Sequence, residues 1–317
     1  MKLLTKQKKP GWVALRTSED NTYAAHVIKP QHTKSHGNKP KVTFGGAWQT
    51  NLKDNTATKN LVADFGLARQ HCSLLLAQGE YKLVHLEKPN VPANELKQAL
   101  SWKLKELIDY PIEQATIDVI NIPPDLNNKN RQSYVYAIAA KNELLSDYIQ
   151  RFVDSGAGLE VIDIPELAQR NIAAYLEQEN RGLAMLSINN AGGLLTFTSG
   201  GELYHARHIE IDTTQLQSTD SERKTKVFER LSLEIQRSLD SFEREFTYIT
   251  TNRLVLAPFA GREECYDYLK SFLNIQIDRL DLADIFEFED KFELGDLAMQ
   301  ASLLPVLGAA LREGESA

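Results

Sequence analysis

Apolar and polar residues alternate along much of the first 88 residues, as they do in strands that bury one face. Such stretches flank a polar turn at Ser18–Asn21 and a second turn at Gly79, and they cover residues 11–17, 22–28, 71–77 and 81–87. Residues 29–56 are rich in Lys, Asn and Thr and predict a loop with a short pair of strands, while residues 60–70 predict a short helix. We therefore expect a β-meander with one helical insertion.

Helical spacing begins at residues 92–108, where leucines three or four positions apart share one face: Leu96, Leu100, Leu104 and Leu107. Pro111 marks the end of this helix, because a residue before proline disfavours the helical conformation. The segments that follow predict two strands, a helix closed by Gly156, a strand, and a helix with Pro165 in its first turn, at 115–122, 132–140, 141–157, 159–164 and 165–179.

The second half begins a similar series. Three strands are predicted first, and then a helix, a strand, a helix, a strand and a final helix, at 182–188, 193–199, 202–211, 221–246, 253–259, 262–273, 275–280 and 296–313. The apolar stripe of residues 228–246 indicates a core helix rather than a partner surface. The order of three strands, helix, strand and helix thus occurs twice in rough form. Two such halves form the architecture of actin, Hsp70 and sugar kinases, although a generic α/β chain is the alternative.

Composition narrows the class of protein. The chain has 317 residues, 42% of them hydrophobic and 25% charged, which is enough for the cores of two ordinary domains. Cys72 and Cys265 stand in no metal-type spacing, which favours buried thiols in a reducing compartment. A net charge of −7 argues against a nucleic-acid-binding protein. With no signal peptide and no apolar run long enough to span a bilayer, we expect a cytoplasmic protein. The four lysines of residues 1–10 indicate a solvated terminus, with contact to anionic lipid as the alternative.

Three segments resemble the PilM family of pilus assembly proteins. Residues 95–119 resemble the segment I-P-F/Y-P-L-E-E-V-x-L-D through Ile108, Tyr110, Pro111, Ile112, Glu113 and Asp118, with Asp109 in place of the first proline. Residues 158–171 resemble V-D-V-E-x-x-A-L-x-R through Val161, Asp163, Glu166 and Arg170. Residues 308–313 resemble the closing G-L-A-L-R. The resemblance spans about residues 60–312, and within the family the chain is most similar to the branch that serves the MSHA pilus.

The resemblance implies a cytoplasmic scaffold with an actin-like (RNase H-like, duplicated) two-domain α/β fold. Domain I would cover residues 1–170, with a small subdomain inserted near 89–142 and the C-terminal helix 297–313 packed on it; domain II would cover 171–296. The implied partner is the short cytoplasmic N-terminal tail of a single-pass PilN-like protein of a type IV pilus, with the assembly ATPase or other platform proteins as further partners. The related GspL carries a membrane span after its actin-like part, whereas this chain ends at Ala317 without one, which favours the PilM-like arrangement.

Actin-like proteins hold a nucleotide at two D-I-G-x-x-x-T phosphate loops and one Gly-Gly-Gly turn. In the first loop of this chain, Ala14 stands in place of the aspartate and Arg16 in place of the glycine. In the second loop, Ser187 replaces the aspartate and Asn189 the glycine. In the third turn, the glycines are replaced by Ala257, Pro258 and Phe259. Both carboxylates that would position Mg²⁺ are missing. We therefore expect no catalytic residue, cofactor or metal, and a plain hairpin turn at Asn189–Gly193 with Asn190 at positive φ.

The alternative is an ATP-binding actin-like switch or ATPase in the same machinery, which would need an acidic Mg²⁺ ligand such as Asp163, Asp212 or Asp240. A sugar kinase is a weaker third hypothesis, because it needs a general base and intact loops. His205 and His208 suggest a metal pair, but residues three apart on a strand face opposite sides, so exposed histidines are expected instead.

A partner surface is expected beside the predicted helix of residues 92–108. Trp102 lies off its leucine face, and a Tyr-Pro-Ile elbow follows it, so a groove for an extended apolar peptide is one hypothesis. The predicted lining residues are Leu96, Leu100, Trp102, Tyr110, Pro111 and Ile112. The other hypothesis is that Trp102 caps a small subdomain core.

Overall fold

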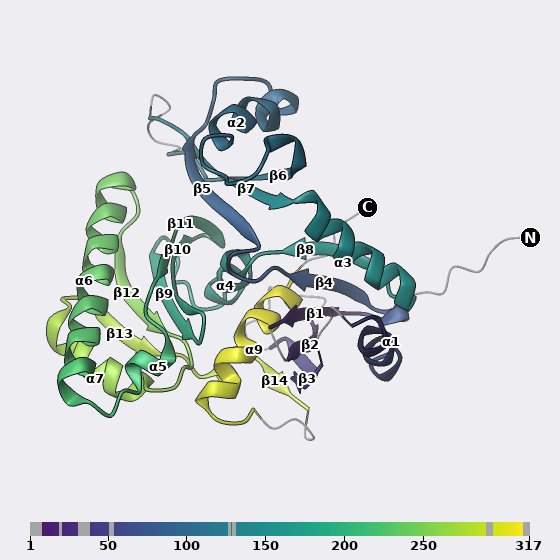
Figure 1. Ribbon diagram of the computed structural model, residues 1–317. Coiled ribbons are helices and arrows are strands. Elements are labelled where there is room, and N and C mark those ends of the chain that lie inside the picture. Colours follow the sequence, from purple (N-terminus) through teal and green to yellow (C-terminus); the bar gives the residue numbers. More distant parts are fainter. Residues whose placement is uncertain are drawn as a thin grey trace, which may run out of the picture.

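The computed structural model describes residues 8–18, 21–30, 39–50, 54–125, 128, 131–289 and 294–312. It contains a six-stranded, a five-stranded and a three-stranded sheet with helices between and around them (Figure 1). Within these ranges, no helix combines the length and the apolar character that a bilayer crossing needs. Most of the basic segment 1–10 lies outside the described residues.

The six-stranded sheet has the order β14-β3-β2-β1-β4-β8, made of Glu287–Phe288, Lys41–Trp48, Thr22–Ile28, Trp12–Thr17, His71–Leu75 and Leu159–Asp163. The predicted hairpin of β1 and β2 is confirmed. Of the strand pair predicted within residues 29–56, the described residues contain β3, which pairs with β2 from end to end; residues 31–38 and 51–53 lie outside the described residues. The predicted meander is wrong. The helix α1 (Asn55–Asp64) crosses over between β3 and β4, so that β4 lies parallel to β1.

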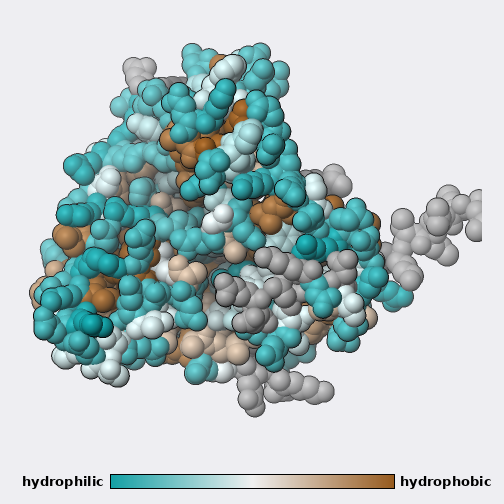
Figure 2. Space-filling view, in the orientation of Figure 1, coloured by the Kyte–Doolittle hydropathy of each residue, from teal (hydrophilic) through white to brown (hydrophobic). Residues whose placement is uncertain are grey.

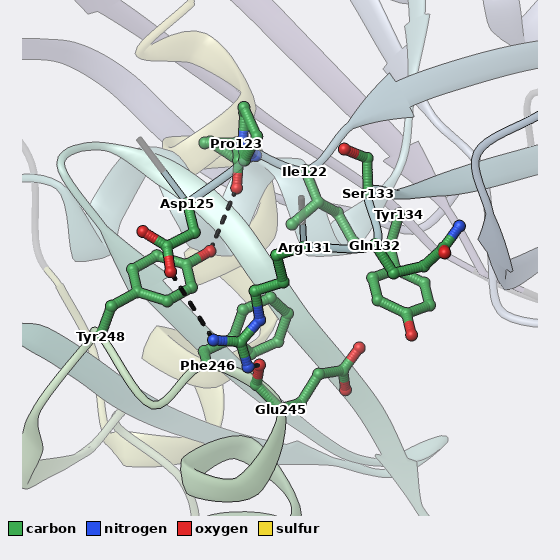
Figure 3. A pocket seen from close by; sticks show the side chains of 11 residues that line it. Ile122, Pro123, Asp125, Arg131, Gln132, Ser133, Tyr134, Glu245, Phe246 and Tyr248 are labelled. Atoms are coloured by element: carbon green, nitrogen blue, oxygen red, sulfur yellow. Dashed lines mark hydrogen bonds and ion pairs between the residues drawn. The ribbon is translucent and has the colours of Figure 1, made fainter. Parts of the chain in front are cut away.

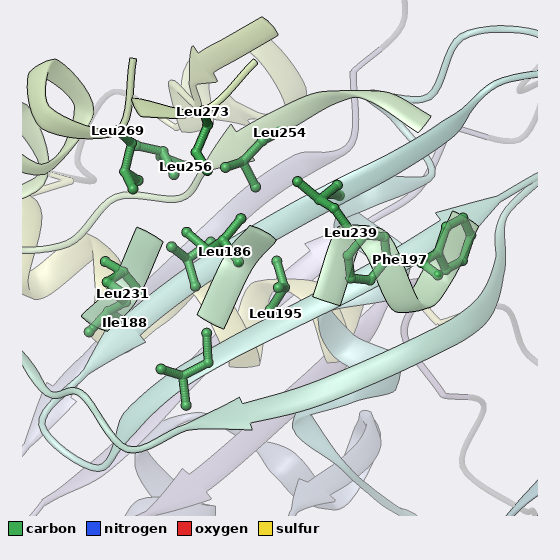
Figure 4. Close-up of a cluster of buried hydrophobic side chains, with 14 of the residues drawn as sticks. Leu186, Ile188, Leu195, Phe197, Leu231, Leu239, Leu254, Leu256, Leu269 and Leu273 are labelled. Atoms are coloured by element: carbon green, nitrogen blue, oxygen red, sulfur yellow. The ribbon is translucent and has the colours of Figure 1, made fainter. Parts of the chain in front are cut away.

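The five-stranded sheet has the order β11-β10-β9-β12-β13, made of Glu202–Ile209, Gly192–Ser199, Gly182–Asn189, Thr251–Leu256 and Gln276–Arg279. Its first three strands are antiparallel, and β12 and β13 run parallel to β9. The six-stranded sheet repeats this pattern in its strands β3, β2, β1, β4 and β8. The predicted duplication is therefore confirmed in the strand order. The helices α6 (Ser221–Glu245) and α7 (Arg262–Phe272) cover one face and bury the predicted stripe against it (Figure 4).

Two helices lie between the two large sheets: α4 (Pro165–Ala173) and α9 (Leu297–Ala310) (Figure 1). They touch closely at Gly308, where an added Cβ would collide with the carbonyl oxygen of Ala168. The ion pair between Asp163 and Arg312, at 2.9 Å, joins the end of β8 to the second residue after α9. The other described helices are α3 (Asn142–Ser155), which ends at Gly156 as predicted, α5 (Thr213–Leu216) and α8 (Leu282–Ile285).

The three-stranded sheet, called the inserted sheet below, has the order β5-β7-β6, made of Tyr81–Glu87, Tyr134–Lys141 and Ala115–Asn121. Because β5 pairs with β7, this unit begins before the expected residue 89. The helix α2 (Leu96–Leu104) covers one face with buried leucines. It is shorter than predicted at both ends, since a 3₁₀ turn precedes it and Leu107 falls beyond its last turn and is exposed.

Candidate functional site: three strand turns and the inserted sheet

The first predicted turn follows β1. Ala14 is fully buried, and Arg16 lies two residues later on the same face of the strand, which packs toward α9. The guanidinium of Arg16 lies 5.2 Å from the ring centre of Tyr23, and its Nε is buried without a hydrogen-bond partner. Burial lowers the pKa of this guanidinium. A bulky cation therefore stands where a phosphate loop has a glycine.

The second turn joins β9 and β10 as a two-residue hairpin, as predicted. The Ser187 hydroxyl donates a 2.6 Å hydrogen bond to Gln169 of α4, whose amide donates in turn to the Met185 carbonyl at 2.8 Å. The Asn189 side chain accepts a hydrogen bond from the Ala191 N–H at 2.7 Å. The prediction of positive φ at Asn190 is wrong; Gly192 adopts it, at +127°.

The third turn follows β12, and its three side chains are packed inside the protein. Ala257 and Phe259 are fully buried, Ala257 between the sheets and Phe259 in the core under α6 and α7. Pro258 between them is buried as well. Where a Gly-Gly-Gly turn would leave room for an adenosine, this turn presents protein side chains.

The acidic residues considered as Mg²⁺ ligands have other contacts. Asp163 is buried, accepts a hydrogen bond from the Ile164 N–H at 2.8 Å and pairs with Arg312; burial raises its pKa. Asp212 caps the N-terminus of α5, and Asp240 accepts a hydrogen bond from Gln236 at 2.8 Å. Nowhere in the described part of the chain do three potential metal ligands lie together.

The two histidines of β11 lie on opposite faces, as predicted, but the expectation that both are exposed is wrong for His205. Its ring packs against Phe197, and burial lowers its pKa to about 4. His208 is partly exposed, and its Nε2 lies 2.7 Å from a carboxylate oxygen of Glu166 on α4. Sequence reasoning missed this contact, because nothing in the spacing of the residues places β11 beside α4.

The predicted partner residues divide into two groups. Leu96 and Leu100 are buried against the inserted sheet, so the prediction that they line a partner surface is wrong. Trp102 is 72% exposed and therefore does not cap a core. In the elbow that follows, Pro111 is exposed, Ile112 packs partly on the core, and Tyr110 lies under the Lys141 ammonium group at 5.1 Å. Figure 2 shows a patch of apolar residues over this inserted unit, framed by hydrophilic ones.

Sequence reasoning also missed a small pocket between the β6–β7 loop and the end of α6 (Figure 3). Arg131 stacks on Tyr248 at 5.3 Å and donates a hydrogen bond to the Thr247 hydroxyl at 3.0 Å. The Tyr248 hydroxyl donates to the Pro123 carbonyl at 3.3 Å. These contacts attach the inserted sheet to the five-stranded half.

No family model matches this chain, and no curated protein matches its sequence. Its structure is similar to PilM in the PilM–PilN type IV pilus biogenesis complex, with 17% identity and a TM-score of 0.69 over 94% of this chain and 98% of that one. It is also similar to a Bacteroides thetaiotaomicron protein of unknown function with an actin-like ATPase fold, with 12% identity and a TM-score of 0.51 over 93% and 96% of the two chains. The chain therefore has an actin-like fold, as the duplicated sheets predicted.

Proposed function

We propose that this chain is a cytoplasmic scaffold of a type IV pilus, and that it binds the cytoplasmic N-terminal tail of a PilN-like membrane protein at the inner membrane. The observation that supports this most is the similarity to PilM over nearly the whole of both chains. Two halves of residues 1–170 and 171–296 would form the actin-like body. From the sequence resemblance we also propose a role in the MSHA pilus, like that of the biogenesis protein MshI.

The proposed binding surface lies on the inserted unit and includes Trp102, Tyr110, Pro111 and Ile112. An exposed tryptophan offers a partner a large apolar area at a small entropic cost, which is typical of residues that dominate binding energy. Figure 2 shows other apolar residues on the surface of the same unit, among hydrophilic ones. An extended apolar tail that packs on these residues needs no catalytic group.

The proposed scaffold neither binds nor hydrolyses ATP. In the three turns, the side chains of Arg16, Pro258 and Phe259 stand where glycines would let the backbone approach a nucleotide, and Ser187 is engaged with Gln169. Ala14 and Ser187 cannot replace the carboxylates that would hold Mg²⁺ and its waters.

Calorimetric titration tests the proposal. The purified chain is titrated with a synthetic peptide of the PilN-like tail, and separately with Mg-ATP. We expect peptide binding, a loss of at least about tenfold in affinity for Trp102→Ala, as for an aromatic hot spot, and no heat from ATP. Phe272→Ala is the matched control, because Phe272 on α7 is 64% exposed and lies in the other half of the protein. Equal losses in both variants would remove Trp102 from the site, and micromolar ATP binding would favour the switch hypothesis instead.

A further inference from the structure

The inserted sheet meets the edge strand β11 of the five-stranded half in a contact that we call the β11 joint. It consists of His85 and Tyr136 from the inserted sheet, His205, Ala206 and His208 from β11, and Glu166 from α4. At its centre the Ala206 N–H donates a 2.9 Å hydrogen bond to the Tyr136 hydroxyl oxygen. β11 is the edge strand of its sheet (Figure 1), and this hydrogen bond uses one backbone group of that edge.

On the α6 side of the joint, two half-buried histidines come from different sheets: His85 from β5 and His205 from β11. His205 lies with its Nδ1 buried and without a hydrogen-bond partner. His85 stacks on Tyr134 at 4.8 Å, and its buried Nε2 also makes no hydrogen bond. Each histidine would repel the other if both were charged, and Arg207 adds to the positive charge around His205.

On the α4 side, Glu166 is fully buried and connects three parts of the chain. It accepts a 2.7 Å hydrogen bond from the Tyr81 hydroxyl of β5, and it lies 2.7 Å from His208 of β11. Burial and the neighbouring carboxylate raise the pKa of Tyr81 well above its usual value, so this tyrosine stays a donor. Glu166 therefore ties α4 to β5 and β11 through two side-chain contacts of its carboxylate.

We propose that the β11 joint is a proton-sensitive latch, which holds the inserted sheet on β11 while His85 and His205 are neutral and loosens when they take up protons. An open joint would expose the Ala206 N–H and the inner face of the inserted sheet. This inference rests on the contacts of the joint alone and does not depend on which partner the chain binds.

The charged neighbours support the direction of the effect. Glu245 of α6 lies 3.4 Å from His85 Nε2. The rings of Tyr134 and Tyr136 of β7 pack against the His85 ring. Arg207 of β11 forms an ion pair with Glu234 of α6. Glu245 is the one group here that would favour a charged His85, but it is half-buried and burial raises its own pKa. The carboxylate of Glu234 is shared with Arg207 and does not offset a charge on His205.

The size of the effect follows from linkage. Burial lowers the pKa of His205 to about 4, and that of His85 below its usual value. In the open joint both rings meet water and return toward ~6.5, so the open state binds more protons. The ratio of open to closed joints therefore rises as pH falls below about 6.5. For His205 alone this ratio rises ~10-fold at pH 5.5 and ~30-fold at pH 5, relative to pH 8.

Spin labels test the latch in the full chain. Labels at Gln98→Cys on α2 and Glu229→Cys on α6 report the distance between the two units; both positions are exposed. The native thiols stay unlabelled because burial raises the pKa of each to about 12. We expect a second distance population that grows at least tenfold between pH 8 and pH 5 and disappears when the pH is returned to 8.

Variants separate the latch from general acid sensitivity. The double variant His85→Gln, His205→Gln carries no titratable ring in the pair and should lose the pH response, while His71→Gln, on the far sheet, should keep it. If the double variant does not fold, as judged by circular dichroism at pH 8, the single variant His85→Gln serves instead and should weaken the response. An unchanged distance distribution from pH 8 to pH 5, or a full response in the histidine variants, would overturn the proposal.

Discussion

Removing the side-chain charge of Arg312 should destabilise the protein in a pH-dependent way. Arg312 pairs at 2.9 Å with Asp163, which is 3% exposed, so Arg312→Met leaves a buried carboxylate without its counter-charge. Breaking a buried pair in this way costs about 3–5 kcal/mol. The Arg312 side chain is 33% exposed, so water reaches this site and reduces the expected loss to about 2 kcal/mol at pH 7.5.

The pH dependence has a definite sign. Burial raises the pKa of Asp163, and Arg312 opposes that rise. Without Arg312 the pKa rises further, so the folded variant prefers a protonated Asp163. The loss of stability is then fully present above the folded pKa of Asp163 and disappears below about 4, where the carboxyl is protonated in the unfolded chain as well. The difference between wild type and variant should shrink as pH falls.

Urea unfolding at pH 7.5 and pH 4.5 measures this difference. Arg279→Met is the matched control, because Arg279 pairs with Glu263 at the surface, where water screens the pair and its loss should change stability little. Comparison of each variant with wild type at the same pH cancels the effect of the histidines. A loss for Arg312→Met no larger than that of the control, or a loss that grows toward low pH, would refute the reasoning.

Three further outcomes are expected. Arg16→Met should leave the urea midpoint unchanged or raise it, since a buried, incompletely bonded charge is replaced by an apolar chain of similar length; a clear fall would show that the guanidinium has a stabilising partner. Gly308→Ala should lower the free energy of unfolding by about 1–3 kcal/mol, because the added Cβ would collide with the Ala168 carbonyl. Gly158→Ala is the control: the structure has room for its Cβ, so thermal unfolding should show almost no change. Both cysteine thiols, whose pKa burial raises to about 12, should react with a thiol reagent only after denaturant is added, and rapid labelling of the native protein would contradict their burial.

The sequence predicted the local elements better than their pairing. Alternation and 3.6-residue spacing report which face of an element is buried, so the stripe of α6 and the strands of the second half were found. The same patterns do not say which strands are neighbours. For this reason β4 and β5, which are adjacent in sequence, were placed in one meander, although β4 pairs with β1 and β5 with β7.

At the candidate site, the sequence indicated which residue types occupy the predicted positions, but not which groups their side chains contact. The sequence alone predicts that Arg16, Ser187 and Phe259 depart from a nucleotide-binding pattern. It does not show that Gln169 accepts a hydrogen bond from the Ser187 hydroxyl, because that contact joins a helix to a strand of the other half. Trp102 was expected off the leucine face, and it is exposed; Leu100 was expected to line the same groove, but the inserted sheet buries it.

The segments that carry the family resemblance lie where the parts of the fold are joined. Asp163 and Arg312 connect β8 to the end of α9, and Glu166 connects α4 to both β5 and β11. Gln169, in the same segment, adds a contact from α4 to β9. Side chains of this protein thus make direct contacts between the two halves.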